Sequence, residues 1–114
     1  MSEKEKLYKA IERAGLQDGL IGRSHGLILE VLKKGDFCKS EIFDQVKGRN
    51  YLTAPQQVIR ATDQLVEIRA TKSVGTRKTV YAEIAEEEEV YQITERGKLL
   101  LDELHEQFES FDRG

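Results

Sequence analysis

The stretch TAPQQVIRATDQLVEIRATKSVGTRKTVYAEI, residues 53–84, decides the fold because a helical pattern in its first half gives way to a strand pattern. Thr53 and Gln56 fit a helix N-cap and its partner three residues later, and Pro55 suits the first turn. At 100° per residue, the apolar side chains fall on one face and polar ones on the other. The apolar positions are Val58, Ala61, Leu65 and Ile68. The pattern predicts a helix with one buried face and one free face.

After this helix the hydrophobic period becomes that of strands. The expected strands are residues 69–73, 79–84 and 90–93. Residues 74–78 contain Gly75 and residues 86–89 are four glutamates, so both segments are predicted as turns.

Helices are also predicted on both sides of this stretch. Apolar side chains at helical spacing indicate helices at residues 3–14, from Ser24 to Gly35, and at residues 39–46. A last helix should open at Thr94 and run to about residue 112, a length of roughly 28 Å.

The predicted fold class is α+β, mainly α: a winged helix-turn-helix with three helices, a two- to three-stranded antiparallel wing and a long C-terminal helix. We expect one domain over residues 1–114. It divides into an N-terminal helix and loop (1–22), a winged-helix core (23–94) and a dimerisation helix (95–114).

Composition limits the class of protein. The chain has 114 residues, of which 39% are hydrophobic and 34% charged, as expected of one globular domain with a modest core. No apolar run approaches the ~20 residues that span a bilayer, and the first residues do not resemble a signal peptide. Cys38 is the only cysteine, which excludes a disulfide framework. We expect a cytoplasmic protein of prokaryotic or viral origin.

The distribution of charge along the chain favours a polyanionic partner, although the net charge does not. The formal net charge is −3, which alone argues against nucleic-acid binding. Residues 47–78, however, contain seven basic and only two acidic residues. A polyanion responds to the local field of the surface that it meets.

Several segments together resemble a known family. Residues 91–101, YQITERGKLLL, follow the form Y-x-L-T-x-x-G-x-x-L-L, and they are accompanied by HGLIL (25–29), SEI (40–42), ATDQLVE (61–67) and GTRK (75–78). Over residues 24–108 the chain resembles the winged-helix regulators of the PadR and MarR families. Arg69 stands where these families usually place a glycine, and residues 85–89 are inserted, so either hairpin could be the wing. The resemblance implies a transcription regulator, a repressor, that binds palindromic operators as a dimer.

On the predicted recognition helix, Gln56, Gln57 and Arg60 could contact base edges, since Gln pairs with adenine and Arg with guanine. The alternative is an ordinary solvated helix face. Asp63 and Glu67 would face phosphates, so only the first two turns should enter the major groove.

Other basic residues could contact the DNA backbone. Lys72, Arg77 and Lys78 could reach phosphates or the minor groove, or their charges could only block edge pairing of the hairpin. Lys47, Arg49 and Asn50 precede the recognition helix and could clamp a phosphate with its N–H groups. Thr53 and Arg69 complete the predicted DNA-binding set. Residues 86–89 are predicted as a solvated turn that could also repel DNA or meet a basic partner.

The terminal helices are predicted to form a homodimer, because their apolar strip looks too wide for a small domain to cover. The predicted dimer residues are Leu7, Tyr8, Ile11, Leu100, Leu101, Leu104, Phe108 and Phe111.

No motif indicates catalysis, a cofactor or a metal. His25 and His105 lack a ligand pattern around them, and Cys38 is either a buried helix-start residue or a redox sensor. Three functions follow: a dimeric regulator that binds double-stranded DNA, a winged-helix protein-interaction module, and an architectural DNA-binding protein with little sequence preference. The operator and any small-molecule effector stay undetermined.

Overall fold

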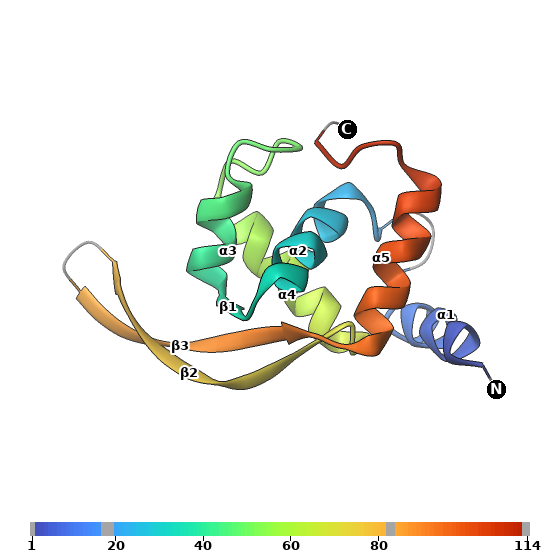
Figure 1. The fold of residues 1–114 in the computed structure, drawn as a ribbon, viewed down its shortest axis with the longest axis horizontal. Helices are drawn as coiled ribbons and strands as arrows, with labels where there is room; N and C mark the ends of the chain where they lie inside the picture. Colours follow the sequence, from blue (N-terminus) through green and yellow to red (C-terminus); the bar gives the residue numbers. More distant parts are fainter. Residues whose placement is uncertain (1, 17–19, 82–83, 113–114) are drawn as a thin grey trace.

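The computed structural model describes residues 2–16, 20–81 and 84–112. They form an α+β fold, mainly helical, with five helices and a three-stranded antiparallel sheet (Figure 1). In chain order the elements are α1 (Glu3–Arg13), α2 (Arg23–Lys34), β1 (Phe37–Cys38), α3 (Lys39–Val46), α4 (Pro55–Glu67), β2 (Thr71–Tyr81), β3 (Ile84–Ile93) and α5 (Glu95–Gln107). The longest dimension is 46 Å, with the β2–β3 hairpin at one end and α1 at the other (Figure 1). None of the described helices has the length and apolarity needed to cross a bilayer.

The sheet has the strand order β1-β3-β2. β2 and β3 form a long antiparallel hairpin in which Thr76 lies opposite Glu89 and Thr79 opposite Glu86. The register shifts between Ser73 and Gly75, where Gly75 has a φ of 143°. Glycine reaches that backbone region without a steric penalty, so it forms a β-bulge inside the strand.

The two turns predicted at residues 74–78 and 86–89 are therefore wrong. Both segments are strand, and residues 76–79 pair directly with residues 86–89. Glycine and clustered charges usually mark turns, but here each glutamate finds a threonine, lysine or arginine across the ladder. One long hairpin replaces the two short ones expected, and its residues 82 and 83 lie outside the described part.

The helices α1 to α4 lie where the apolar spacing predicts them. The first residue of α2 differs from the expectation, because its N-cap is Gly22 and not Ser24. Ser24 Oγ instead accepts a hydrogen bond from Asn50 Nδ2 at 2.9 Å, which ties α2 to the loop between α3 and α4.

The last helix is shorter than predicted. α5 ends at Gln107, and Phe108 takes an extended backbone with φ −126° and ψ 129°. The chain then turns so that the ring of Phe111 packs against Gly26 of α2, where a Cβ atom would overlap it. Phe111 is only 4% exposed. The last aromatic residue thus closes the core of its own chain.

The predicted dimer face is mostly buried within the single chain. Buried residues are Leu7, Leu100, Leu101, Leu104 and Phe111, and half-buried ones are Ile11 and Phe108. The premise that the terminal aromatics face water is wrong, because the fold covers them and the Arg23 guanidinium lies 4.3 Å from the Phe108 ring centroid. Of the eight residues, Tyr8 alone is exposed, at 49%.

α5 begins in close contact with the turn that joins α4 to β2. The Thr94 hydroxyl accepts a hydrogen bond from the Gly97 N–H at 3.1 Å and donates to the Arg69 carbonyl at 2.6 Å. The Thr94 N–H donates to the Ala70 carbonyl at 3.0 Å. A Cβ atom on Gly97 would overlap that same carbonyl oxygen. We call this contact the Thr94/Gly97 junction.

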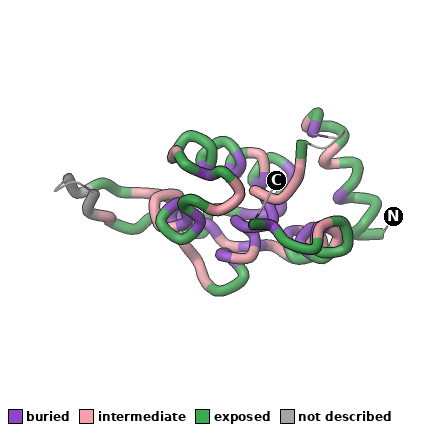
Figure 2. Tube along the Cα trace, turned by 90° about the horizontal axis from the view of Figure 1, so that it is seen from above, coloured by how far each residue is buried: buried purple, intermediate pink, exposed green. Residues whose placement is uncertain are grey.

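The core lies between the helices and the near half of the sheet. Figure 2 shows the buried segments gathered in the middle of the molecule, whereas the described far part of the hairpin is mostly exposed. The hairpin therefore projects from the core into solvent.

His25 is a polar residue within this core, 6% exposed. Its Nδ1 accepts a hydrogen bond from the Gly22 N–H at 3.1 Å, and its Nε2 lies 2.8 Å from Gln64 Oε1. Because a backbone N–H can only donate, Nδ1 carries no proton and the Nε2–H donates to Gln64. Burial lowers the pKa of His25, and the hydrogen bond to Gln64 opposes that shift in part. The neutral ring links the start of α2 to α4.

Replacing Gly97 with alanine should destabilise the fold by about 3 kcal/mol, because backbone atoms of the junction must move to admit a methyl group. The measurement is the free energy of unfolding in urea. Gly22→Ala is the matched control: no atom lies within 4 Å of its Cβ position, and it should cost less than about 1 kcal/mol. Equal losses in the two variants would contradict the close contact at Gly97.

Acidification from about pH 7 to pH 5.5 should lower the free energy of unfolding. The unfolded chain protonates His25 near its ordinary pKa of ~6.5, and the buried ring does not, so stability is complete above that pH and is lost below it. One proton accounts for at most about 1.4 kcal/mol per pH unit. His25→Gln should flatten the dependence. An unchanged profile in His25→Gln would count against the neutral ring.

Candidate nucleic-acid interface

The outward face of α4 carries two of the predicted base-contacting side chains free of other contacts. Gln56 and Arg60 are exposed, and no hydrogen bond or ion pair engages them within the described residues. The opposite face packs on the core through Val58, Ala61 and Leu65. The helix thus presents a rigid polar surface in its first two turns. Asp63, further along, pairs with Lys39 at 2.6 Å.

Gln57 makes the capping hydrogen bonds at the start of α4 that the sequence pattern predicted for Gln56. Its Oε1 accepts hydrogen bonds from the N–H groups of Thr53 and Ala54 at 2.8 and 3.0 Å. The N-cap is Ala54, so the expected pair of Thr53 and Gln56 is displaced by one residue. The Gln57 amide oxygen is therefore occupied, which leaves Gln56 and Arg60 as the free side chains.

The basic residues of the hairpin do not form the uncompensated patch that the sequence suggested. Arg77 Nη1 donates to both carboxylate oxygens of Glu41 at 2.8 and 2.9 Å, and its Nη2 donates to the Asp36 carbonyl at 3.3 Å. Lys78 lies opposite Glu87 in the ladder. The four glutamates of β3 flank this basic strand, so the charge of the hairpin is nearly balanced.

Glu41 and Glu88 hold the hairpin against α3. Burial alone would raise the pKa of Glu41, but hydrogen bonds from Cys38 and the ion pair with Arg77 lower it. Burial likewise opposes the shift at Glu88, whose pKa is lowered by hydrogen bonds from Ser40 and Thr79. Residues 86–89 are therefore part of the sheet and of its contact with α3, not a solvated turn.

Cys38 is fully buried at the start of α3. Burial and its contact with Glu41 raise the pKa of the thiol to about 11. Because the thiolate is the reactive form, this environment favours the structural interpretation of Cys38 over the redox one.

The loop before α4 is tied to the C-terminal segment. Arg49 Nε donates to Asp112 Oδ1 at 2.5 Å, and the Asn50 N–H donates to the Asp112 carbonyl at 2.9 Å. Asn50 has a positive φ of 44° and is half-buried. Lys47 stays exposed, with its ammonium 5.8 Å from the Phe43 ring centroid. Of the predicted phosphate clamp, only Lys47 is unpaired in the described chain.

Arg69 and Lys72 lie apart from the other predicted contacts. Arg69 follows the C-terminal end of α4, whereas Gln56 and Arg60 lie near its N-terminal end. Lys72 lies at the start of β2. It lines a cavity together with Lys33 and Glu95, and none of the other predicted DNA-binding residues lines that cavity. The structure therefore divides the predicted DNA-binding set into separate groups.

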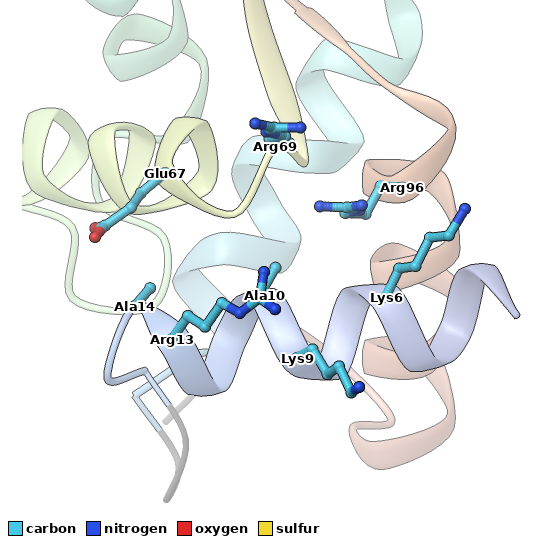
Figure 3. A pocket seen from close by; sticks show the side chains of 8 residues that line it. All are labelled: Lys6, Lys9, Ala10, Arg13, Ala14, Glu67, Arg69 and Arg96. Atoms are coloured by element: carbon cyan, nitrogen blue, oxygen red, sulfur yellow. The ribbon is translucent and has the colours of Figure 1, made fainter. Parts of the chain in front are cut away.

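Sequence reasoning missed a second basic group, in which Arg69 takes part. Five cations surround one cavity of about 460 Å³: Lys6, Lys9, Arg13, Arg69 and Arg96 (Figure 3). We call it the basic pocket. The signal was present on α1, where basic residues recur at positions 6, 9 and 13 and so share a helix face. The charge count over residues 47–78 did not include them.

Comparison with known proteins adds no assignment: neither the protein-family models nor the curated proteins contain a match to this chain.

Proposed function

We propose that this chain is a winged-helix protein that binds duplex DNA by inserting the N-terminal half of α4 into the major groove. The element order supports the proposal: α2, α3 and α4 precede a hairpin, which is the helix-turn-helix plan with a wing added. The observation that carries it is the free, exposed pair of Gln56 and Arg60 on a helix whose other face is locked into the core.

In this proposal the hairpin contributes less than its basic residues suggest. Arg77 must leave Glu41 before it can bind a phosphate, whereas Lys78 and Lys47 make no ion pair with any described residue. Phosphate contacts then orient the helix, and Arg60 supplies specificity by bidentate contact with guanine. Such a protein acts as a transcription regulator, a repressor, when it occupies an operator.

A protein-interaction module is the second candidate, because one observation favours it. A cavity of about 220 Å³ lies between α3, the start of α4 and β3, with Phe43, Pro55 and Ile59 beside Glu86 and Glu88. The carboxylates would repel phosphates, and the apolar side chains would suit a basic, apolar peptide. This cavity adjoins the same helix end that the DNA proposal uses.

The DNA proposal predicts salt-dependent binding of a random duplex, measured by fluorescence anisotropy from about 50 to 200 mM NaCl. Lys78→Ala should reduce the log–log slope by about one unit, and Arg77→Ala by less because of its ion pair. On a duplex site selected by the protein from random sequences, Arg60→Ala should relax the base preference at one position, reducing the discrimination free energy there by about 1–3 kcal/mol. Lys33→Gln, which removes an equal charge from α2, serves as the control.

The outcomes distinguish the candidates. Absence of salt-dependent binding would reject the DNA proposal and favour the interaction module. Equal affinity for selected and random duplexes would favour an architectural protein without sequence preference. Equal losses of Arg60→Ala on both duplexes would make Arg60 a phosphate contact.

A homodimer remains part of the proposal. We place its contact surface on the exposed side of α1, because Tyr8 is the one exposed residue among the eight predicted for the dimer. Two copies of α4 about 34 Å apart would fit successive major grooves. Sedimentation at micromolar concentration should show a dimer, and Tyr8→Ala should weaken it without unfolding the chain, since Tyr8 is half exposed and loses only a surface hydrogen bond to Glu103. Phe111→Glu is unsuitable because it would disrupt the core. A monomeric parent protein would reject the dimer and leave single-site binding.

A further inference from the structure

The basic pocket lies at the opposite end of α4 from the candidate DNA-binding residues. It is formed by α1, the α4–β2 turn and the start of α5 (Figure 3). α4 has 13 residues, so the two ends lie about 20 Å apart. The pocket is therefore a separate site, and its role does not depend on whether Gln56 and Arg60 contact DNA.

Within the described residues, four of the five cations of the basic pocket have no carboxylate partner, a property that they share with Lys47, Arg60 and Lys78. Lys4, Lys39, Arg49, Arg77 and Lys98 each pair with an acidic side chain. In the pocket, Lys6 pairs with Glu3 at 3.1 Å, but within the described residues Lys9, Arg13, Arg69 and Arg96 form no ion pair. Lys9 and Arg13 are four residues apart on one helix, a spacing at which like charges repel. An anion between these side chains would relieve that repulsion.

Arg69 occupies a backbone position that suits glycine better. The Ala70 N–H donates to the Leu65 carbonyl at 2.8 Å and the Arg69 N–H to the Val66 carbonyl at 2.9 Å, which together form a Schellman motif. Arg69 is the left-handed residue of that motif, with φ 63°. Glycine is the usual residue there, so the arginine brings its charge to the pocket at a conformational cost.

The side chains are arranged around the cavity. Figure 3 shows Arg69 and Arg96 across the cavity from α1, and Arg13 on α1 below them. The Glu67 carboxylate points away from these three side chains. Arg96 Nη1 donates to the Ile68 carbonyl at 3.2 Å, which holds that guanidinium in place, and its other N–H groups have no hydrogen-bond partner in the part of the chain that the structure describes. Ala10 supplies a small apolar surface between the cations.

We propose that the basic pocket binds a phosphate-bearing small molecule. Guanidinium groups match phosphate oxygens in bidentate geometry, and those of Arg13, Arg69 and Arg96 line this cavity, with Lys6 and Lys9 at its edge. The volume lies within the range of about 300–1,000 Å³ that is typical of small-molecule sites. The three arginines lie around one hollow and do not form the extended stripe that a nucleic-acid backbone would follow.

The test is isothermal titration calorimetry of the full chain with sodium pyrophosphate at low salt. Arg13→Gln and Arg69→Gly should each weaken binding at least about tenfold, and Lys33→Gln should change it less than about twofold. Arg69→Gly should also melt at or above the temperature of the parent, because glycine relaxes the left-handed residue. Loss of binding in that variant then cannot result from unfolding.

Three results would overturn the proposal. The first is no heat of binding at about 1 mM pyrophosphate. The second is equal affinity in the parent, Arg13→Gln and Arg69→Gly. The third is that both variants lose duplex DNA affinity while pyrophosphate neither binds nor competes, which would make this surface a nucleic-acid contact. Failure of Arg60→Ala to affect DNA binding would reject only the separate proposal for α4.

Discussion

The contact of Gly97 with the Ala70 carbonyl is the constraint on which the arrangement of the other elements depends. It lets α5 begin directly against the turn that ends α4, and Thr94 fixes the two backbones by hydrogen bonds to both Arg69 and Ala70. α4 and β2 leave this turn in set directions, so one contact determines how the polar face of α4 and the hairpin project. It also brings Arg69 and Arg96, which are far apart in sequence, to one side of the same cavity.

Features with local causes could be predicted from the sequence. The spacing of apolar residues located four helices because each buries one face, and the YQITERGKLLL segment located the start of α5 because Thr94 caps it. Features that depend on distant partners could not. β1 is strand only because Phe37 and Cys38 meet Tyr91 and Val90. The hairpin register arises between strands, and the end of α5 is set by Phe111 finding space beside Gly26.

At the candidate sites, the contrast between local causes and distant partners applies to charge as well. A count along the sequence treats each cation as free, but ion pairs form across the fold: Arg77 meets Glu41 and Arg49 meets Asp112. These partners are 36 and 63 residues apart, so no local window could reveal them. Conversely, the basic residues of α1 were unremarkable until the fold placed them beside Arg69. The solvated face of α4 was predictable, since one helical period exposes Gln56 and Arg60 together.

The position of β2 at the edge of the sheet restricts how two copies of this chain can associate. An edge strand offers unpaired backbone groups to any neighbouring strand, and β2 is eleven residues long. It contains Lys72, Arg77 and Lys78 but no acidic residue. In a two-fold antiparallel pairing of β2 with itself about an axis near residues 77 and 78, Arg77 of each copy would lie opposite Lys78 of the other, because an isologous contact is self-complementary. In that register, like charges directly opposite each other disfavour continuation of the sheet across a symmetry axis.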